Sequence, residues 1–154
     1  KEIIVAAECR ILMVSPQPTA VVKITVPMSE IPRAQKESRA KIEEALPKLD
    51  AGTSGYGCTL WRPPVKDKLY MEPGFIVTRG LKPAGEVVAS ELPGGRAAHY
   101  LMRGPYDGLP DAWKMLLGWV EQRNLKPAGI NWEIYGDDHP DPSRLKTQLY
   151  VLLK

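Results

Sequence analysis

The chemistry-bearing stretch of this chain is residues 129–135, Gly-Ile-Asn-Trp-Glu-Ile-Tyr, an apolar and aromatic run with one carboxylate, Glu133, in its middle. Its alternation is typical of a strand, whose successive side chains point to opposite faces. One face carries Asn131, Glu133 and Tyr135, and the other carries Ile130, Trp132 and Ile134.

A buried acid is costly unless a cation, a hydrogen-bond donor or a ligand pairs with it. We therefore expect the Ile130 face to belong to the core and the Glu133 face to form the floor of a binding site. The alternative is that Glu133 is a solvated strand residue that pairs with a Lys or Arg.

Other catalytic chemistry finds little support in the residue pattern. The chain has no Gly-x-Ser-x-Gly elbow and no phosphate-binding glycine loop, and neither Cys9 nor Cys58 has a histidine nearby in sequence. The cysteines could form a disulfide, but we expect two free thiols in a reducing, cytoplasmic compartment. If the protein is an enzyme, Glu133 is its one obvious general base.

Neither a metal nor a cofactor is expected. Cys9, Cys58, His99 and His139 do not have the spacing of a zinc site. The acidic segment 137–141 could suggest a cation site, but a solvated turn explains it better, because a metal cage needs more fixed ligands.

Composition narrows the class of partner. The 154 residues suffice for one domain, 44% of them are hydrophobic, and 21 Lys and Arg against 18 Asp and Glu give a net charge of +3. The basic residues form no run, which is a poor footprint for nucleic acid. The apolar residues 3–14 are interrupted by Glu8 and Arg10 and are too few to span a membrane. We expect a small-molecule partner; the oligomeric state and any upstream segment stay open, since the chain begins at Lys1 rather than Met.

The predicted elements occur twice in the same order. Strands are expected over residues 3–14 and 19–26, a helix over 31–49, and strands over 58–62 and 69–78. The order then begins again with strands over 86–92 and 97–103, a helix over 109–124, and strands over 130–135 and 145–153. Pro47 is expected to end the first regular helix.

Duplication of one α+β unit is the simplest explanation, although strand-helix-strand orders also recur by chance. We expect one domain over residues 1–154, with repeats at about 3–80 and 85–154, in which 19–62 and 96–135 share one fold. Trp61 is then the equivalent of Glu133. If each helix covers one face of an antiparallel sheet, the opposite faces meet in a central ligand cleft. Its expected lining is Trp61, Tyr100, Met102, Glu133 and Tyr135.

Five short motifs together resemble the DNA gyrase inhibitor-like (GyrI-like) small-molecule-binding domain, which is similar to the effector-binding half of multidrug-sensing transcription activators. The motifs lie in order over nearly the whole chain. They are Leu92-Pro93-Gly94-Gly95-Arg96-Ala97, Arg103-Gly104-Pro105-Tyr106, the Trp-containing helix, Trp132-Glu133-Ile134-Tyr135 and Leu145-Lys146-Thr147-Gln148-Leu149.

The resemblance implies two tandem strand-helix-strand-strand units around a ligand cleft, with Glu133 facing the ligand. In members that resemble hydrolases of cyclopropane-bearing toxins, the corresponding Glu works with aromatic residues in ring opening by water. Many relatives carry a His where this chain has Met102, which puts His-dependent chemistry in doubt. No helix-turn-helix precedes the domain in these residues.

The residues therefore favour a module that senses or sequesters a small amphipathic, cationic or aromatic molecule, with Glu133 as its counter-charge. The alternative is a hydrolase that opens a strained electrophile with Glu133 as general base. Four further residues are assigned to structure: Trp113 and Trp119 to the core, Tyr106 to a turn, and His99 to the same strand face as Leu101.

Overall fold

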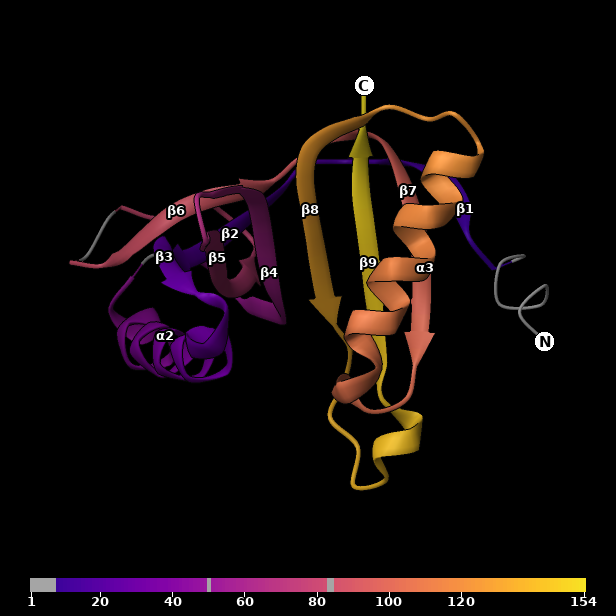
Figure 1. Cartoon of the computed structure of the whole chain (residues 1–154). Coiled ribbons are helices and arrows are strands. Elements are labelled where there is room, and N and C mark those ends of the chain that lie inside the picture. The colour runs from indigo at the N-terminus through magenta and orange to yellow at the C-terminus, as the bar shows by residue number, and fades with distance from the viewer. Residues whose placement is uncertain (1–7, 50, 83–84) are drawn as a thin grey trace. The chain divides into compact units, whose positions relative to one another are not determined.

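Nine strands and two α-helices form in residues 8–49, 51–82 and 85–154, the part of the chain that the computed structural model describes (Figure 1). They fall into two compact units: Pro16–Pro93, and Gly94–Lys154 together with the described residues up to Ser15. The expected α+β class is confirmed. Neither helix is long and apolar enough to cross a membrane.

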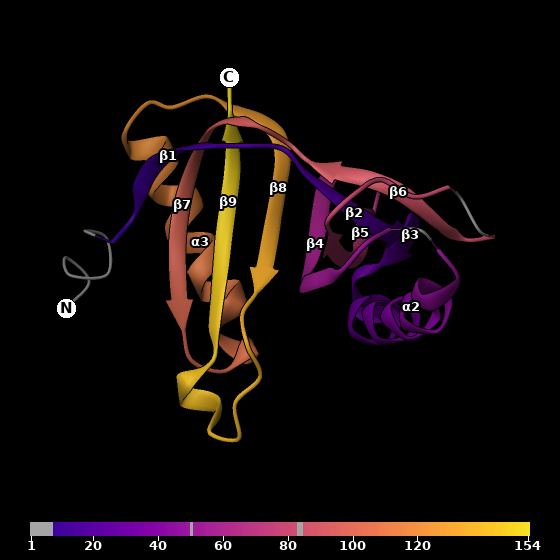
Figure 2. The same ribbon diagram turned by 180° about the vertical axis from the view of Figure 1, so that it is seen from behind.

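The unit that contains Glu133 is a four-stranded antiparallel sheet with one helix. The strands β1 (Arg10–Val14), β7 (Gly95–Arg103), β9 (Lys146–Leu153) and β8 (Pro127–Tyr135) follow one another in that order. The helix α3 (Leu109–Gln122) lies along the strands, and the view from behind shows β7, β9 and β8 in front of it (Figures 1 and 2). Short 3-10 turns, η3 (Tyr106–Gly108) and η4 (Pro142–Arg144), precede α3 and β9.

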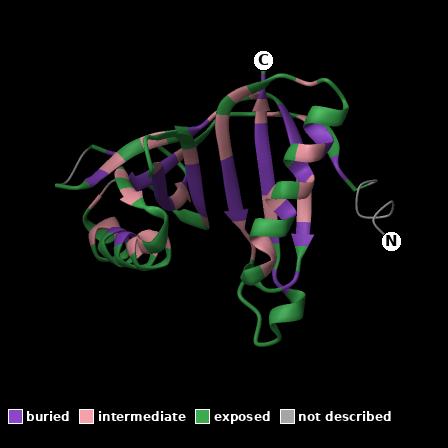
Figure 3. Ribbon diagram, viewed as in Figure 1, coloured by how far each residue is buried: buried purple, intermediate pink, exposed green. Residues whose placement is uncertain are grey.

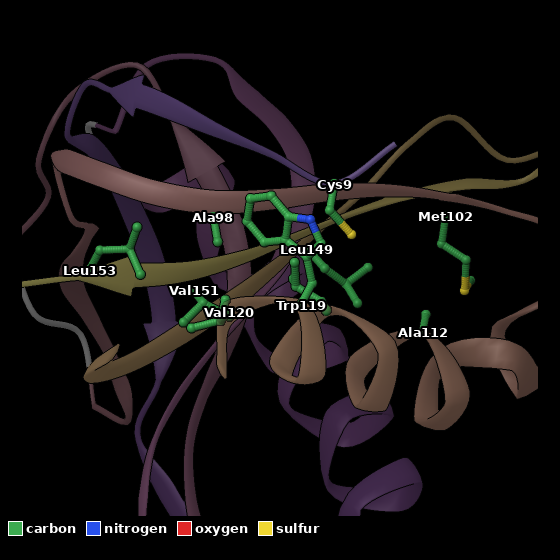
Figure 4. Close-up of a cluster of buried hydrophobic side chains, with 10 residues drawn as sticks. Cys9, Ala98, Met102, Ala112, Trp119, Val120, Leu149, Val151 and Leu153 are labelled. Carbon is green, nitrogen blue, oxygen red and sulfur yellow. The ribbon is translucent and has the colours of Figure 1, made fainter. Parts of the chain in front are cut away.

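The apolar stripe of α3 explains its place on the sheet. Its buried residues, including Leu116 and Trp119, pack against Ala98 of β7 and Leu149 of β9 (Figure 4). The side of the helix turned to the strands is buried or half-buried, and the outer side is exposed (Figure 3). Burial of this stripe stabilises the helix, because an isolated helix of this length is only marginally stable in water.

The second unit has the same construction. The strands β4 (Ser54–Val65), β5 (Lys68–Val77), β2 (Gln17–Val22) and β6 (Val87–Leu92) form its antiparallel order, and β3 (Ile24–Pro27) also pairs with β5. The helix α2 (Ile31–Ala45) buries Ile42 against Ala20, Val22 and Val77. The 3-10 turns η1 (Met28–Glu30) and η2 (Leu46–Lys48) flank the helix, and the second contains Pro47, which is not compatible with continued α-helix.

The two units share one topology, as the repeat predicts. In each, the strand after the helix pairs with the strand that follows it, and that strand pairs with the one before the helix. Residues 58–62 and 130–135 therefore occupy equivalent strands, β4 and β8. The first strand of each expected repeat lies in the other unit. β1 pairs with β7 of the later unit, and β6 pairs with β2 of the earlier one. Residues 3–7 of the first expected strand lie outside the described residues.

Several strand boundaries differ from the sequence-based expectation because of bulges and breaks. The strand expected over residues 58–62 is longer: β4 runs on through Pro63 and Pro64 to Val65 in a register shift, where the missing N–H of proline is tolerated. β8 likewise begins at Pro127, with Gly129 (φ +93°) inside a register shift. The expected strand over residues 19–26 is divided at Lys23 into β2 and β3.

His99 is structural, as its strand position predicts. It is 2% exposed, and its ring lies 4.9 Å from that of Tyr150, which stacks on Trp132 at 5.0 Å. Its Nε2 lies 2.9 Å from Oε1 of Gln148, which also accepts a hydrogen bond from the Tyr150 hydroxyl. A carbonyl oxygen only accepts, so Nε2 of His99 carries a proton. Burial is the main cause that lowers the pKa of His99 from its ordinary 6.5.

This burial predicts that the protein loses stability in mild acid. The unfolded chain takes up a proton on His99 as the pH falls below about 6.5, whereas the folded protein resists it, so the free energy of unfolding decreases. The loss is absent above that pH and grows from pH 6.5 downward. Urea unfolding at pH 7.5 and pH 5.5 measures it. His99→Gln should show a smaller decrease than the wild type, and equal decreases would contradict the assignment to His99.

Candidate functional site

The carboxylate of Glu133 is buried and held at both oxygens. The residue is 4% exposed. Its Oε2 accepts a hydrogen bond from the indole Nε1 of Trp113 at 2.6 Å, and its Oε1 accepts one from the Tyr135 hydroxyl at 2.6 Å. Bonds of this length to a charged acceptor are roughly twice as strong as neutral ones. The carboxylate is therefore fixed in position by two neutral aromatic donors.

Three elements of one unit place these groups. Tyr135 follows Glu133 by two residues on β8, so the strand alternation puts both side chains on the same face. Trp113 lies one turn inside α3, which packs on that face. Tyr106 of η3 meets the Tyr135 ring edge-on, with the ring centroids 5.8 Å apart and the planes at 81°. Since Tyr106 is 41% exposed, a row of aromatic rings leads from the surface to the buried acid.

The expectation that the Ile130 face of β8 belongs to the core is confirmed, because Trp132 and Ile134 are buried, but the helix does not lie on the face opposite Glu133 as expected. Helix α3 covers the Glu133 face rather than the Trp132 face, as the bond from Trp113 shows. Leu149, which lies beside Glu133 in the sheet, belongs to the core under that helix. The Trp132 face is also buried, because Trp132 stacks on Tyr150. The Glu133 face is buried although it is the more polar one, because Trp113 and Tyr135 pair with its acid, and the alternation of residue types could not show that the helix covers it.

Two of the remaining predicted ligand residues lie on β7, which β9 separates from the strand of Glu133. Tyr100 and Met102 lie on the helix-covered face of β7; Leu149 pairs with Tyr100 on one side and with Glu133 on the other. Met102 is 5% exposed and packs into the core near Ala112 (Figure 4). Tyr100 is half-buried against the same core, and burial raises its pKa. Trp61 is a half-buried residue of β4 in the other unit, and its ligand role stays a prediction.

Sequence reasoning missed the donor to the acid, Trp113, and the aromatic neighbour of Tyr135, Tyr106. Trp113 was assigned to the core by its helical spacing, and Tyr106 to a turn. A buried indole needs an acceptor for its N–H, which is a signal that a Trp at the edge of an apolar stripe faces a polar group. Trp119, with the same expected role, does lie in the core.

The cysteines and the acidic turn, within the described part of the chain, show no catalytic arrangement. Cys9 and Cys58 are free thiols, and burial raises the pKa of Cys58 to about 12, so its reactive thiolate is suppressed. Asp141 caps η4 by accepting from the backbone N–H and the hydroxyl of Ser143. Among residues 8–49, 51–82 and 85–154, no three His, Cys, Asp or Glu side chains gather as metal ligands would.

The chain belongs to the GyrI-like family: the GyrI-like small molecule binding domain matches residues 7–154. This confirms the family inferred from the five motifs, and with it a small-molecule-binding domain. No curated protein matches the chain.

Solved structures share the fold at low sequence identity. The EcmrR C-terminal domain is 20% identical, with a TM-score of 0.80 over 95% of this chain and 96% of that domain. In the EcmrR–DNA complex, the match has a TM-score of 0.82 and 20% identity, and covers 95% of this chain but 57% of that longer chain. SAV2435 bound to tetraphenylphosphonium is 11% identical (TM-score 0.71, covering 96% and 94%). A hydrolase encoded by lin2189 from Listeria innocua is 12% identical (TM-score 0.57, covering 96% and 92%).

Proposed function

We propose that this domain binds a small amphipathic organic cation at Glu133, as a ligand sensor or a sequestering module. The observation that carries the proposal is the buried carboxylate held by Trp113 and Tyr135. Trp113 and Tyr135 donate hydrogen bonds that orient the carboxylate of Glu133. A site of this kind is suited to a positive ligand, because electrostatic attraction is stronger in a poorly hydrated environment.

The aromatic rings add the second part of the recognition. Ring faces attract a cation and offer flat apolar surface to the rest of the ligand. Tyr106, Tyr135 and Trp113 supply such rings within one unit, from the exposed rim to the acid. The ligand class is therefore a cation with substantial apolar or aromatic surface. Tetraphenylphosphonium, which SAV2435 binds, belongs to this class and supports the choice of probe.

Hydrolysis of a strained electrophile by Glu133 is the alternative. The geometry favours it less, because hydrogen bonds donated to both oxygens stabilise the charged carboxylate and so weaken it as a base. The likeness to the Listeria hydrolase is one of fold. DNA contact is not part of the proposal for these residues, since the basic side chains form no run.

Two ions of nearly equal size and opposite charge test the proposal. Tetraphenylphosphonium should bind to the wild-type protein in calorimetric titration, and tetraphenylborate should bind at least tenfold more weakly or not at all, because only the cation is attracted to Glu133. Binding of both ions with equal affinity would show that apolar contact alone recognises them and would refute the counter-charge role. Turnover of a cyclopropane-bearing substrate, followed by mass spectrometry and abolished in Glu133→Gln, would favour the hydrolase instead.

A further inference from the structure

A second carboxylate is buried in the other unit, where sequence reasoning did not single it out. Glu72 of β5 is 1% exposed. Its Oε2 accepts a hydrogen bond from the Tyr70 hydroxyl at 2.9 Å, and its Oε1 accepts one from the Ser90 hydroxyl of β6 at 2.5 Å. Burial, followed by the bond to Glu72, raises the pKa of Tyr70, so this hydroxyl keeps its proton and donates.

A positive group of the chain itself lies against this carboxylate. The Nε of Arg62 is 3.6 Å from Oε2 of Glu72, and the guanidinium carbon is 5.8 Å from the centroid of the Tyr70 ring. The Arg62 side chain is 43% exposed, and its contact with the acid is longer than a direct hydrogen bond. Because Arg62 is partly exposed and its contact with the acid is long, its side chain can move into solvent and leave Glu72 to another cation.

The chemistry repeats that of the Glu133 site with different elements. Each acid has a tyrosine two residues away on its own strand, and each receives a second neutral donor from another element: Trp113 for Glu133, and Ser90 for Glu72. At Glu72, Arg62 places a flat cation over the ring of Tyr70. The guanidinium group therefore occupies the position that a ligand cation would take.

We propose that Glu72, Tyr70 and Ser90 form a second organic-cation site, which Arg62 fills from within the chain. A ligand that bears a guanidinium or ammonium group binds there by displacing Arg62 into solvent. The site belongs wholly to the unit Pro16–Pro93, so it does not depend on the function proposed for Glu133.

Removal of the internal cation should open the site to a small cation. In calorimetric titrations with ethylguanidinium chloride, we expect Arg62→Ala to bind at least tenfold more tightly than the wild type. Arg62→Ala/Glu72→Gln should lose that gain, because the carboxylate is gone. Arg62→Ala/Glu133→Gln should keep it, which separates this site from the other. Arg33→Ala, which removes an exposed arginine paired with Glu30, is the matched control and should behave as the wild type.

Two results would overturn the proposal. One is equal affinity of Arg62→Ala and the wild type for ethylguanidinium; the other is a gain that survives Glu72→Gln or disappears with Glu133→Gln. Either would leave the Glu72 cluster as a polar bridge between β5 and β6 only. If circular dichroism shows that the Glu72→Gln protein does not fold, Arg62→Ala/Ser90→Ala replaces it. Loss of one donor to the carboxylate should then reduce the gain, and an unchanged gain would again refute the site.

Discussion

Replacement of Glu133 by Gln should weaken tetraphenylphosphonium binding by roughly 2 kcal/mol or more, about 30-fold in Kd. The change keeps the size of the side chain and removes the charge that we propose attracts the ligand. The amide of Gln has only one acceptor oxygen, so it cannot accept hydrogen bonds from both Trp113 and Tyr135 on separate oxygens as the carboxylate does. Calorimetric titration of both proteins measures the effect.

Two further variants separate charge from structure. Glu133→Asp keeps the charge and should retain much of the affinity if the residue is a counter-charge. Glu121→Gln removes an exposed acid from the same unit and should leave binding unchanged. Urea unfolding of Glu133→Gln shows whether it is folded at the temperature of the titration. A folded Glu133→Gln protein with wild-type affinity would exclude Glu133 as the group that recognises the cation.

Replacement of Gly74 by Ala should destabilise the protein by about 4 kcal/mol or prevent folding, an effect at the extreme end for single substitutions. The added Cβ would overlap the carbonyl oxygen of Ala20 and would lie 2.8 Å from Cα of Val21. Both atoms belong to the backbone of β2, which pairs with β5 at this point, so neither can move without breaking the ladder. Chemical unfolding, or the yield of folded protein, measures the loss.

A second glycine provides the control for this prediction. A Cβ at Gly118 in α3 would meet no atom within 4 Å. Because alanine favours a helix interior more than glycine does, Gly118→Ala should stabilise the protein by up to about 1 kcal/mol. If Gly74→Ala were as stable as the wild type, the close approach of β2 and β5 would not constrain the fold.

The amino-acid pattern by itself predicted most of the local structure. The starts of both helices, at Ile31 and Leu109, follow from 3.6-residue apolar periodicity, and the repeated element order indicated the shared topology of the two units. Strand alternation alone placed Glu133 and Tyr135 on one face, close enough for the hydrogen bond that the structure contains. These features depend on neighbours in sequence, and periodicity reports them directly.

Only the tertiary structure decided how these elements combine. Alternation showed which face of β8 is the more apolar, but it could not show that α3 covers the Glu133 face or that Trp113 donates to the acid. The exchange of β1 and β6 depends on pairing between strands that are far apart in the sequence, and local propensity does not predict such pairing. The sequence gives no sign that Glu72 is buried. Its donors are the hydroxyl groups of Tyr70 and Ser90, and no sequence pattern predicts that these residues bond to it. Burial of a charge is decided by which groups the fold brings to it, and that is a property of the packed chain.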